Sequence, residues 1–168
     1  MHPRALHLGS RFMTESLGIL TGEDYLASLR DGRQVWLEGA LVGDVTAHPA
    51  FRNATRSIAR LYDSLHDPGQ RDLYLTTDRE GNRTHRFFCP AGSANDLMAA
   101  REAIAAWARL SYGFMGRTPD YKAAFMSSLG ADPSFYEPFE ANAKRWYTEY
   151  ASRCLFRVGR HSAPAEAT

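Results

Sequence analysis

The chain has little cysteine and almost no net charge. Only Cys89 and Cys154 occur among its 168 residues, far apart in the sequence. This spacing matches neither a disulfide framework nor a zinc pattern, and it predicts two buried or partly buried small side chains. Twenty basic residues against 19 acidic residues leave a net charge of +1, with no basic run that could follow a phosphate backbone. The composition therefore argues against nucleic acid as a partner.

Long apolar runs and the common catalytic motifs are also absent. No run approaches the roughly 20 apolar residues that a membrane span needs, and the first residues lack the apolar centre of a signal peptide. We therefore expect a cytoplasmic protein without a membrane partner. No Gly-x-Gly-x-x-Gly, Gly-x-Ser-x-Gly, His-Glu-x-x-His or phosphate-loop pattern occurs. These absences argue against the common nicotinamide, hydrolase, zinc-enzyme and nucleotide triphosphatase classes.

The length fits one domain, by the usual expectation of roughly 100–200 residues for each. Residues 1–20 show little periodicity and are predicted to be a mobile leader. Thr21 is a candidate helix N-cap, followed by acidic residues in the first turn of a short helix that ends near Gly32. We expect the folded domain to span residues 21–156, followed by a divergent or disordered tail over residues 157–168.

Two β-hairpins and one amphipathic helix are predicted in the first half of the chain. Residues 34–38 and 40–42 flank Gly39 in the first hairpin, and residues 72–77 and 83–88 flank a polar turn in the second. Between the hairpins, a helical period begins at Phe51 and stops before Pro68. Its apolar positions are Ala54, Ile58, Leu61, Tyr62 and Leu65.

Three further helices are predicted in the second half. Ser93 can cap a long helix through about residue 112, and the inward positions expected on it are Leu97, Ala100, Ile104 and Trp107 or Ala108. Asp120 begins another helix, with Tyr121, Ala124 and Phe125 on a common face. Asp132 and Pro133 open the last helix, whose repeating apolar residues are Phe139, Ala143, Trp146, Tyr147 and Tyr150. The predicted fold class is mainly α with two small β-hairpins.

A glycine-punctuated segment, residues 111–121, connects two of these helices. Gly113 and Gly116 permit unusual backbone dihedral angles, while Arg117 and Tyr121 supply a fixed cation and a phenolic hydroxyl. Such a turn could hold a small aromatic ligand that carries a hydroxyl group. The alternative is an ordinary connection between helices, in which the arginine pairs with a neighbouring acid and the tyrosine packs in the core.

The sequence also resembles a known family. Residues 21–33, 44–53, 83–88 and the segment 111–121 resemble the 4-hydroxyphenylacetate 3-monooxygenase oxygenase component family, in a consistent order from about Thr21 to about Leu155. The resemblance implies the N-terminal helical domain of an acyl-CoA dehydrogenase-like fold. It also implies a flavoprotein aromatic hydroxylase, a two-component monooxygenase that uses FADH2 from a separate flavin reductase. Full-length relatives are expected to form homo-oligomers and to hydroxylate a phenol ortho to its hydroxyl group.

The family's substrate-holding Arg-x-x-x-Tyr pattern falls on Arg117 and Tyr121, with Thr118, Pro119 and Asp120 between them. The resemblance implies that the arginine favours the phenolate form of a phenolic substrate, and that the tyrosine hydrogen-bonds the same oxygen or a reaction intermediate. These two residues are the expected catalytic pair, and all five are expected to bind substrate. The segment contains no cysteine, unlike the related 4-hydroxybutyryl-CoA dehydratases, which argues against an iron–sulfur cluster.

The likeness weakens towards the end of the chain. A histidine that the family has after the last helix corresponds to Gly159 here, and His161 is displaced by two positions. Because family members run to several hundred residues, the resemblance implies an isolated N-terminal domain that is inactive by itself. The rival hypothesis is a non-catalytic helical domain that binds a partner chain through the aromatic face of its last helix. His85 is expected to be structural or on the surface, and His48 to brace the loop before Phe51.

Overall fold

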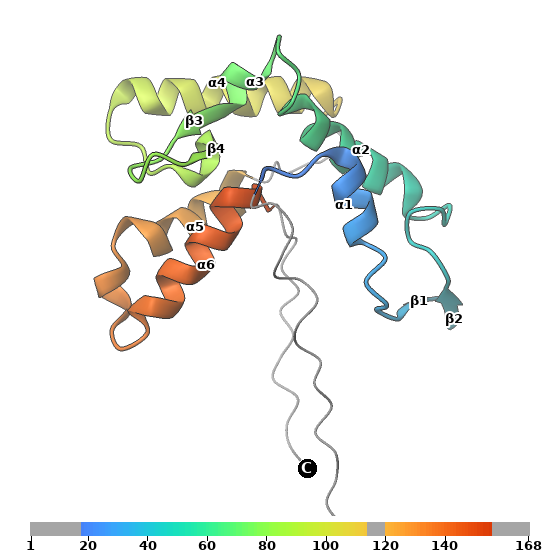
Figure 1. Ribbon diagram of the computed structural model, residues 1–168. Coiled ribbons are helices and arrows are strands. Elements are labelled where there is room, and N and C mark those ends of the chain that lie inside the picture. The colour runs from blue at the N-terminus through green and yellow to red at the C-terminus, as the bar shows by residue number, and fades with distance from the viewer. Residues whose placement is uncertain (1–17, 114–119, 156–168) are drawn as a thin grey trace, which may run out of the picture.

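The computed structural model describes residues 18–113 and 120–155, and Asp120 is described in its backbone only. Figure 1 shows a mainly helical chain with two small antiparallel hairpins, which confirms the predicted fold class. No helix in the described ranges is long and apolar enough to cross a membrane. The predicted boundaries at residues 20 and 156 stay predictions.

The elements in chain order are α1 Gly22–Ser28, β1 Val35–Leu37, β2 Ala40–Val42, α2 Arg52–Ser64, α3 Arg71–Tyr74, β3 Leu75–Thr77, β4 Arg83–His85, the 3-10 turn η1 Arg86–Phe88, α4 Ala94–Leu110, α5 Asp120–Ala131, the 3-10 turn η2 Pro133–Tyr136 and α6 Glu140–Arg153.

Helix α1 begins with a reciprocal cap and is tied to α2. The Thr21 hydroxyl accepts from the Asp24 amide at 3.1 Å, and the Asp24 carboxylate accepts from the Thr21 amide at 2.9 Å. This confirms Thr21 as the predicted N-cap. The Gly22 amide donates to Oδ1 of Asp63 at 2.8 Å. A Cβ at Gly22 would lie 2.7 Å from the Ala59 carbonyl oxygen, so glycine lets α1 approach α2 this closely.

The first hairpin forms around Gly39 as predicted. Trp36 lies opposite Leu41 in the antiparallel register, and the turn residues Glu38 and Gly39 have φ angles of 51° and 81°. Two consecutive left-handed residues match the right-handed twist of the flanking strands. The hairpin projects away from the helices (Figure 1), and Trp36 is 61% exposed. Its two strands contact mainly each other.

The second hairpin is shorter than predicted, because half of each predicted strand is helical. Residues 71–74 form α3 and residues 86–88 form η1, so only three residues pair on each side. Phe87 and Phe88 are both buried. Neighbouring residues in a strand point to opposite faces, so this segment must turn to bury both rings. The Arg86 guanidinium donates to the carbonyl oxygens of Leu73 at 3.0 Å and Asp72 at 3.1 Å, which holds α3 against η1.

Helices α2 and α4 bury faces that differ in part from the predicted ones. Helix α2 runs to Ser64 and stops before Pro68 as predicted, but Ala54 is exposed and Thr55 is buried in its place. Helix α4 begins at the predicted cap, where the Ser93 hydroxyl accepts from the Asp96 amide at 3.2 Å. Leu97 was expected inside and is 63% exposed. Residues 94–98 are all exposed because the packed part of α4 begins only in its next turns.

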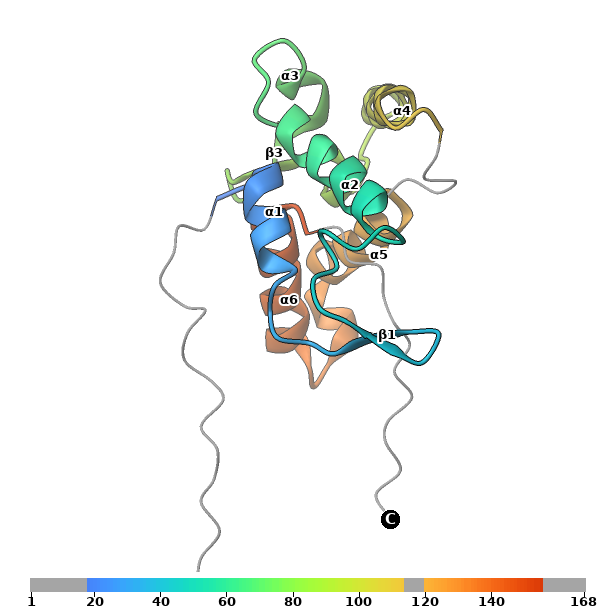
Figure 2. The ribbon, with the colours of Figure 1, turned by 90° about the vertical axis from the view of Figure 1, so that its right-hand side faces the viewer.

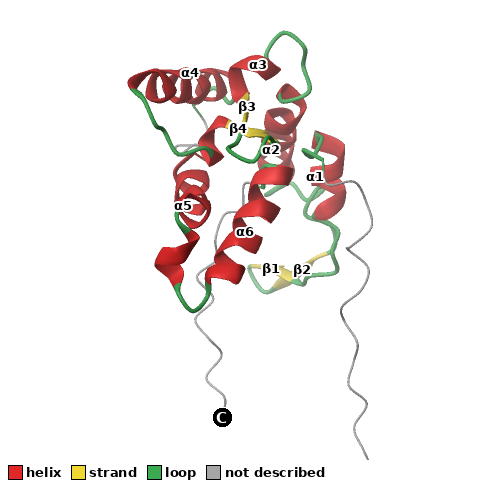
Figure 3. Ribbon diagram, turned by 60° about the vertical axis from the view of Figure 1, so that its left-hand side comes forward, coloured by secondary structure: helices red, strands yellow, loops and turns green. Residues whose placement is uncertain are grey.

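The last helices form an antiparallel pair (Figure 3). The predicted common face of Tyr121, Ala124 and Phe125 exists, but it faces solvent, and Ala123 and Ser127 are buried instead. Asp132 and Pro133 open η2 rather than the last helix, which starts at Glu140.

Tight packing joins α5 to α6. A Cβ added to Gly130 would lie 2.4 Å from the Tyr147 ring, so only glycine permits this approach. Of the predicted α6 stripe, Ala143 is buried and Tyr147 and Tyr150 are half-buried, whereas Phe139 and Trp146 are exposed.

One hydrophobic core unites the two halves of the chain. It contains Trp107, Tyr74 and Phe88, all fully buried. Leu20 near the first described residue and Cys154 near the last belong to the same cluster. The two ends of the described chain therefore meet at one core.

Candidate functional site

The predicted substrate segment lies where α4 ends and α5 begins. Its central residues, Arg117, Thr118 and Pro119, lie outside the described residues, and so does the side chain of Asp120. Of the five predicted site residues, Tyr121 is the one with a described side chain. Their convergence on a common ligand therefore stays a prediction.

The chain enters this segment through two consecutive left-handed residues. Tyr112 and Gly113 have φ angles of 54° and 68°, and the Gly113 amide donates to the Ala108 carbonyl oxygen at 2.8 Å. This hydrogen bond satisfies a carbonyl at the end of α4 and turns the chain sharply. The unusual dihedral angle predicted for Gly113 is confirmed. Tyr112 is 84% exposed, and the guanidinium carbon of Arg60 lies 5.7 Å from the centre of its ring.

Tyr121 occupies the first turn of α5. Its side chain is 47% exposed, and the Lys122 ammonium nitrogen lies 5.1 Å from the centre of its ring. A cation at this distance is attracted by the ring face. Ala123, two residues further, is buried and fixes the orientation of the helix. The Tyr121 ring thus lies on an accessible face of α5.

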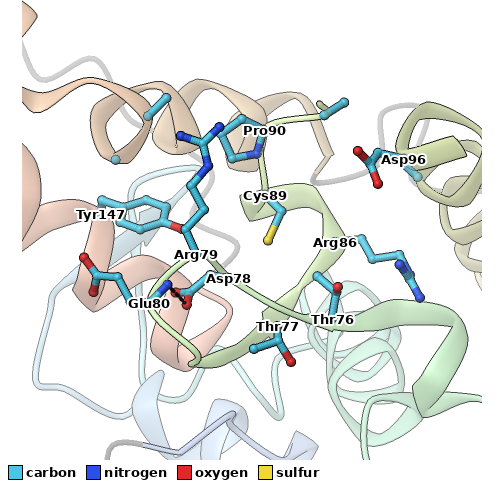
Figure 4. Close-up of a pocket in the computed structure, with 14 residues that line it drawn as sticks. Thr76, Thr77, Asp78, Arg79, Glu80, Arg86, Cys89, Pro90, Asp96 and Tyr147 are labelled. Carbon is cyan, nitrogen blue, oxygen red and sulfur yellow. Dashed lines mark hydrogen bonds between the residues drawn. The ribbon is translucent and has the colours of Figure 1, made fainter. Parts of the chain in front are cut away.

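A cavity of about 330 Å³, which no sequence pattern indicated, lies beside the β3–β4 turn. Figure 4 shows Arg79, Cys89 and Tyr147 around it, with Asp96 on the side opposite Tyr147. Burial raises the pKa of Cys89 and raises the pKa of Tyr147 to about 12. Both groups are therefore neutral near pH 7, and Cys89 is not an activated nucleophile. The only sequence signal here was the polar turn between the strands, which indicates a turn and no ligand.

A second cavity, of about 680 Å³, lies on the other side of the same turn. Asp78 lines both cavities, but its Oδ1 accepts from the amides of Glu80 at 2.9 Å and Asn82 at 2.8 Å. These bonds commit the carboxylate to the turn. His66 uses its Nε2 to contact the Leu20 carbonyl oxygen at 3.0 Å. Asp78 and His66 at this cavity thus hold the local fold together.

The described residues include no cluster that could bind a metal ion. Within residues 18–113 and 120–155, no group of three His, Cys, Asp or Glu side chains could bind a metal ion. Both cavities at the β3–β4 turn have charged rims. The large exposed aromatic side chains lie elsewhere, on the β1–β2 hairpin, α5, η2 and α6. Tyr147 is the aromatic side chain that lines both cavities, beside the charged Asp78 and Glu80.

The histidines described here have structural roles. His85 is fully buried and its Nδ1 accepts from the Phe87 amide at 3.1 Å. His48 braces the loop before α2 as predicted: its Nδ1 accepts from the Ala50 amide at 3.2 Å, and its ring centre lies 5.6 Å from that of Phe51. His161 lies outside the described residues.

Comparison with known proteins places these observations in context. The sequence profile of the family described as 4-hydroxyphenylacetate 3-hydroxylase N terminal matches residues 21–164. Over 138 residues, the chain is 60% identical to the pyoverdin chromophore biosynthetic protein PvcC of Pseudomonas aeruginosa, covering 82% of this chain and 27% of that protein. It is 57% identical to the 4-hydroxyphenylacetate 3-monooxygenase oxygenase component of the same organism, covering 81% of this chain and 26% of that protein. The chain therefore spans about a quarter of the length of these relatives.

Solved structures agree with this relationship. The oxygenase component of 4-hydroxyphenylacetate 3-monooxygenase, complexed with FAD and 4-hydroxyphenylacetate, superposes with a TM-score of 0.70 and 32% identity, over 79% of this chain and 28% of that one. An archaeal 4-hydroxybutyryl-CoA dehydratase from N. maritimus superposes with a TM-score of 0.63 at 22% identity, over 79% of this chain and 27% of that one, which shows the fold alone. These matches confirm the acyl-CoA dehydrogenase-like fold.

Proposed function

Because this chain belongs to the 4-hydroxyphenylacetate 3-hydroxylase N-terminal family, we propose that it forms the substrate-side domain of a two-component, FADH2-dependent monooxygenase. The oxygenase would hydroxylate a phenol ortho to its hydroxyl group, with 4-hydroxyphenylacetate or a tyrosine-like phenol as substrate. The observation that carries this proposal is the family match across residues 21–164. It is supported by 57% identity to the 4-hydroxyphenylacetate 3-monooxygenase oxygenase component of Pseudomonas aeruginosa.

In this proposal Arg117 and Tyr121 hold the phenol. A guanidinium beside the phenolic oxygen lowers the pKa of the phenol, because it stabilises the phenolate. The Tyr121 hydroxyl would donate to the same oxygen and orient the ring. Thr118, Pro119 and Asp120 would shape the wall between them. The left-handed pair Tyr112 and Gly113 supports this role, since it directs the chain from α4 into the segment.

The cofactor would be FAD, delivered as FADH2 by a separate flavin reductase. Reduced FAD, when bound, supplies the oxygen-transfer chemistry, and the protein orients the phenol and excludes water. Since this chain covers about a quarter of the length of the relatives, we propose that other regions of these longer proteins contribute most of the flavin site. We also propose that such an oxygenase acts as a homo-oligomer, and that these 168 residues alone do not complete the reaction.

A chimeric oxygenase tests the proposal. Residues 21–155 replace the matching segment of the Pseudomonas aeruginosa oxygenase component, and catechol formation from 4-hydroxyphenylacetate is measured with reductase and FAD present. We expect turnover, and a loss of at least tenfold in kcat/KM for Arg117→Ala, about 1.4 kcal/mol of transition-state stabilisation. Tyr121→Phe should also lower it.

The matched control is Arg101→Ala, which removes an exposed arginine from α4. Its kcat/KM should stay within twofold of the parent chimera. Equal activity of Arg117→Ala and Arg101→Ala would remove Arg117 from the site. The 168-residue chain alone, supplied with FADH2, oxygen and the phenol, should give no catechol, and product would contradict that part of the proposal.

A second candidate function rests on exposed aromatic side chains. Phe125 on α5, Phe135 on η2 and Phe139 before α6 are 67%, 82% and 65% exposed, and Trp146 on α6 is 39% exposed. Clustered exposed apolar residues favour a partner-binding surface. A non-catalytic domain of this kind would bind a partner chain without flavin. An inactive chimera that is folded would favour this second function over the first.

A further inference from the structure

Helix α2 carries a stripe of exposed arginines on one face. Arg52, Arg56 and Arg60 are spaced four residues apart, so they follow one another along the helix surface. On α4, exposed Arg109 lines a shallow groove of about 390 Å³ together with Arg60. The C-terminal end of α4 approaches α2 there (Figure 2). We call these four residues the arginine stripe.

The stripe is unfavourable for the isolated helix. Like charges four residues apart repel each other. Helix α2 also begins at Arg52 with no acidic residue in its first turn, so a cation lies at the positive end of the helix dipole. Among the described ion pairs none involves a residue of the stripe. Apart from the contact of Arg60 with the Tyr112 ring, the described fold gives no electrostatic reason for this arrangement.

Several other arginines on the described surface form ion pairs with nearby acidic residues. Arg30 pairs with Asp44 at 3.2 Å, and Arg33 pairs with Asp31. Arg71 lies 3.6 Å from Asp72. Acidic residues thus lie close to several exposed arginines, whereas the four arginines of the stripe, three of them on one face of α2, have no acidic partner among these ion pairs.

The groove beside the stripe has the chemistry of a protein interface. Its floor includes Leu73 and Leu110, and Tyr112 stands at its rim with its ring 84% exposed. The guanidinium carbon of Arg60 lies 5.7 Å from the centre of that ring. Arginine and tyrosine around an apolar floor are typical of residues that dominate binding energy between proteins.

We propose that the arginine stripe and its groove bind an acidic helical segment of a partner protein. Charge complementarity identifies the occupant: successive stripe residues on α2 are about 6 Å apart along the axis, which matches carboxylates at every fourth position of a helix. A nucleic acid fits less well, because the net charge of the chain is nearly balanced and Leu73 and Leu110 in the groove suit apolar side chains better than phosphates. This inference stands independently of phenol hydroxylation.

The test uses the 168-residue chain and two labelled peptides of identical composition. In the matched peptide three glutamates occupy positions i, i+4 and i+8 of a helix, and in the scrambled peptide they are spread around it. Fluorescence anisotropy at 50 mM NaCl should show at least fivefold tighter binding of the matched peptide. Raising the salt to 200 mM should weaken binding at least fivefold.

Charge reversal identifies the surface. Arg56→Glu with Arg60→Glu should weaken binding of the matched peptide at least tenfold, and so should the milder Arg56→Gln with Arg60→Gln. The control, Lys144→Glu with Arg145→Glu on α6, changes the net charge equally on exposed residues away from the stripe. It should change the affinity by less than twofold. Circular dichroism confirms that each variant is folded.

Four results would overturn the proposal: no binding at 50 mM NaCl, equal affinity for both peptides, equal loss in the control, or no loss in the stripe variants. A DNA duplex or phosphatidylserine vesicles bound more tightly than the matched peptide, and dependent on the stripe, would replace the protein partner with a nucleic acid or a membrane surface. Every binding measurement omits flavin, oxygen and phenol. Failure here would therefore leave the hydroxylase proposal unaffected.

Discussion

His85 is a titratable residue that is fully buried in the core. Its ring centre lies 4.0 Å from that of Phe87 and 4.5 Å from that of Trp107. Burial lowers the pKa of His85 from about 6.5 to about 3, so the folded chain keeps the imidazole neutral. The unfolded chain binds a proton near pH 6.5. Since the unfolded state then binds more protons, the free energy of unfolding falls as the pH falls through this window.

We expect His85→Asn to flatten this dependence. The asparagine side-chain oxygen can accept from the Phe87 amide as Nδ1 does, but it does not titrate. Between pH 6.5 and 5 the wild-type free energy of unfolding should fall by up to about 1.4 kcal/mol per pH unit more than that of the variant. Urea unfolding followed by circular dichroism measures both slopes. Parallel slopes would show that another group causes the acid sensitivity.

A second prediction at the scale of a single residue concerns Gly130, where α5 packs closely against α6. Because its Cβ would lie 2.4 Å from the Tyr147 ring, Gly130→Ala must push α5 away from α6. We expect a loss of roughly 1–3 kcal/mol in the free energy of unfolding. The control is Gly43→Ala, where a Cβ would meet nothing within 4 Å. If both variants had the same stability in urea, the close approach of the two helices would be refuted.

Some single residues could be predicted from sequence and others could not. Thr21, Ser93 and Gly39 were predicted correctly because caps and tight turns depend on neighbouring residues. The complete burial of His85 depends on Trp107, which is distant in sequence, so no local pattern could indicate it. The roles of Arg117 and Tyr121 came from family resemblance and stay predictions.

Among the elements, α6 ends in an unusual way. Cys154 terminates it with a φ angle of 50°, a left-handed conformation in which glycine is the usual residue. The Cys154 side chain is fully buried, which explains why a residue with a side chain is kept there. The Tyr62 hydroxyl donates to the Cys154 carbonyl oxygen at 3.0 Å, and the Thr84 hydroxyl donates to the Ala151 carbonyl oxygen at 2.8 Å. Two distant elements thus hold the end of this helix.

Removing these hydroxyl groups should loosen the end of α6. Tyr62→Phe removes the hydroxyl donor to the buried Cys154 carbonyl, which costs about 1–3 kcal/mol. Thr84→Val costs less, because the Ala151 carbonyl still accepts from the Cys154 amide at 3.4 Å. Hydrogen exchange of residues 150–155 should become faster in both variants. Thr148→Val is the control, because Thr148 is exposed and donates within its own helix to the Lys144 carbonyl oxygen. Unchanged exchange in Tyr62→Phe would show that the hydroxyl does not anchor the helix.

The existence of most elements was predictable, but the faces that they bury were less so. The period in α5 correctly grouped Tyr121 with Phe125, yet this face is exposed, because apolar periodicity does not say which side meets a neighbour. In the second hairpin, aromatic and β-branched residues favoured full strands. Buried Phe87 and Phe88 instead required a turn, which shows tertiary packing overriding local propensity.

Across the whole molecule, stability depends on the hydrophobic core around Trp107 and little on the β1–β2 hairpin. Trp107 is fully buried among α3, β4 and α4, whereas Trp36 is 61% exposed on a hairpin that contacts mainly itself. We expect Trp107→Ala to lower the free energy of unfolding by roughly 3–5 kcal/mol. Trp36→Ser should change it by less than about 0.5 kcal/mol. Urea unfolding monitored by circular dichroism compares the two, and a large loss in Trp36→Ser would mean that the hairpin is part of the cooperative unit.

The meeting of Leu20 and Cys154 in one core has a topological consequence. Gly18 and Ile19 also line a cavity with Ala151 and Ser152, so both ends of the described chain leave from one place. The two ends of the described chain can therefore be joined covalently without disturbing the core. A circular permutant, joined by a short linker between residues 155 and 18 and opened between Glu38 and Gly39, would keep the core contacts, because the new ends fall in an exposed turn.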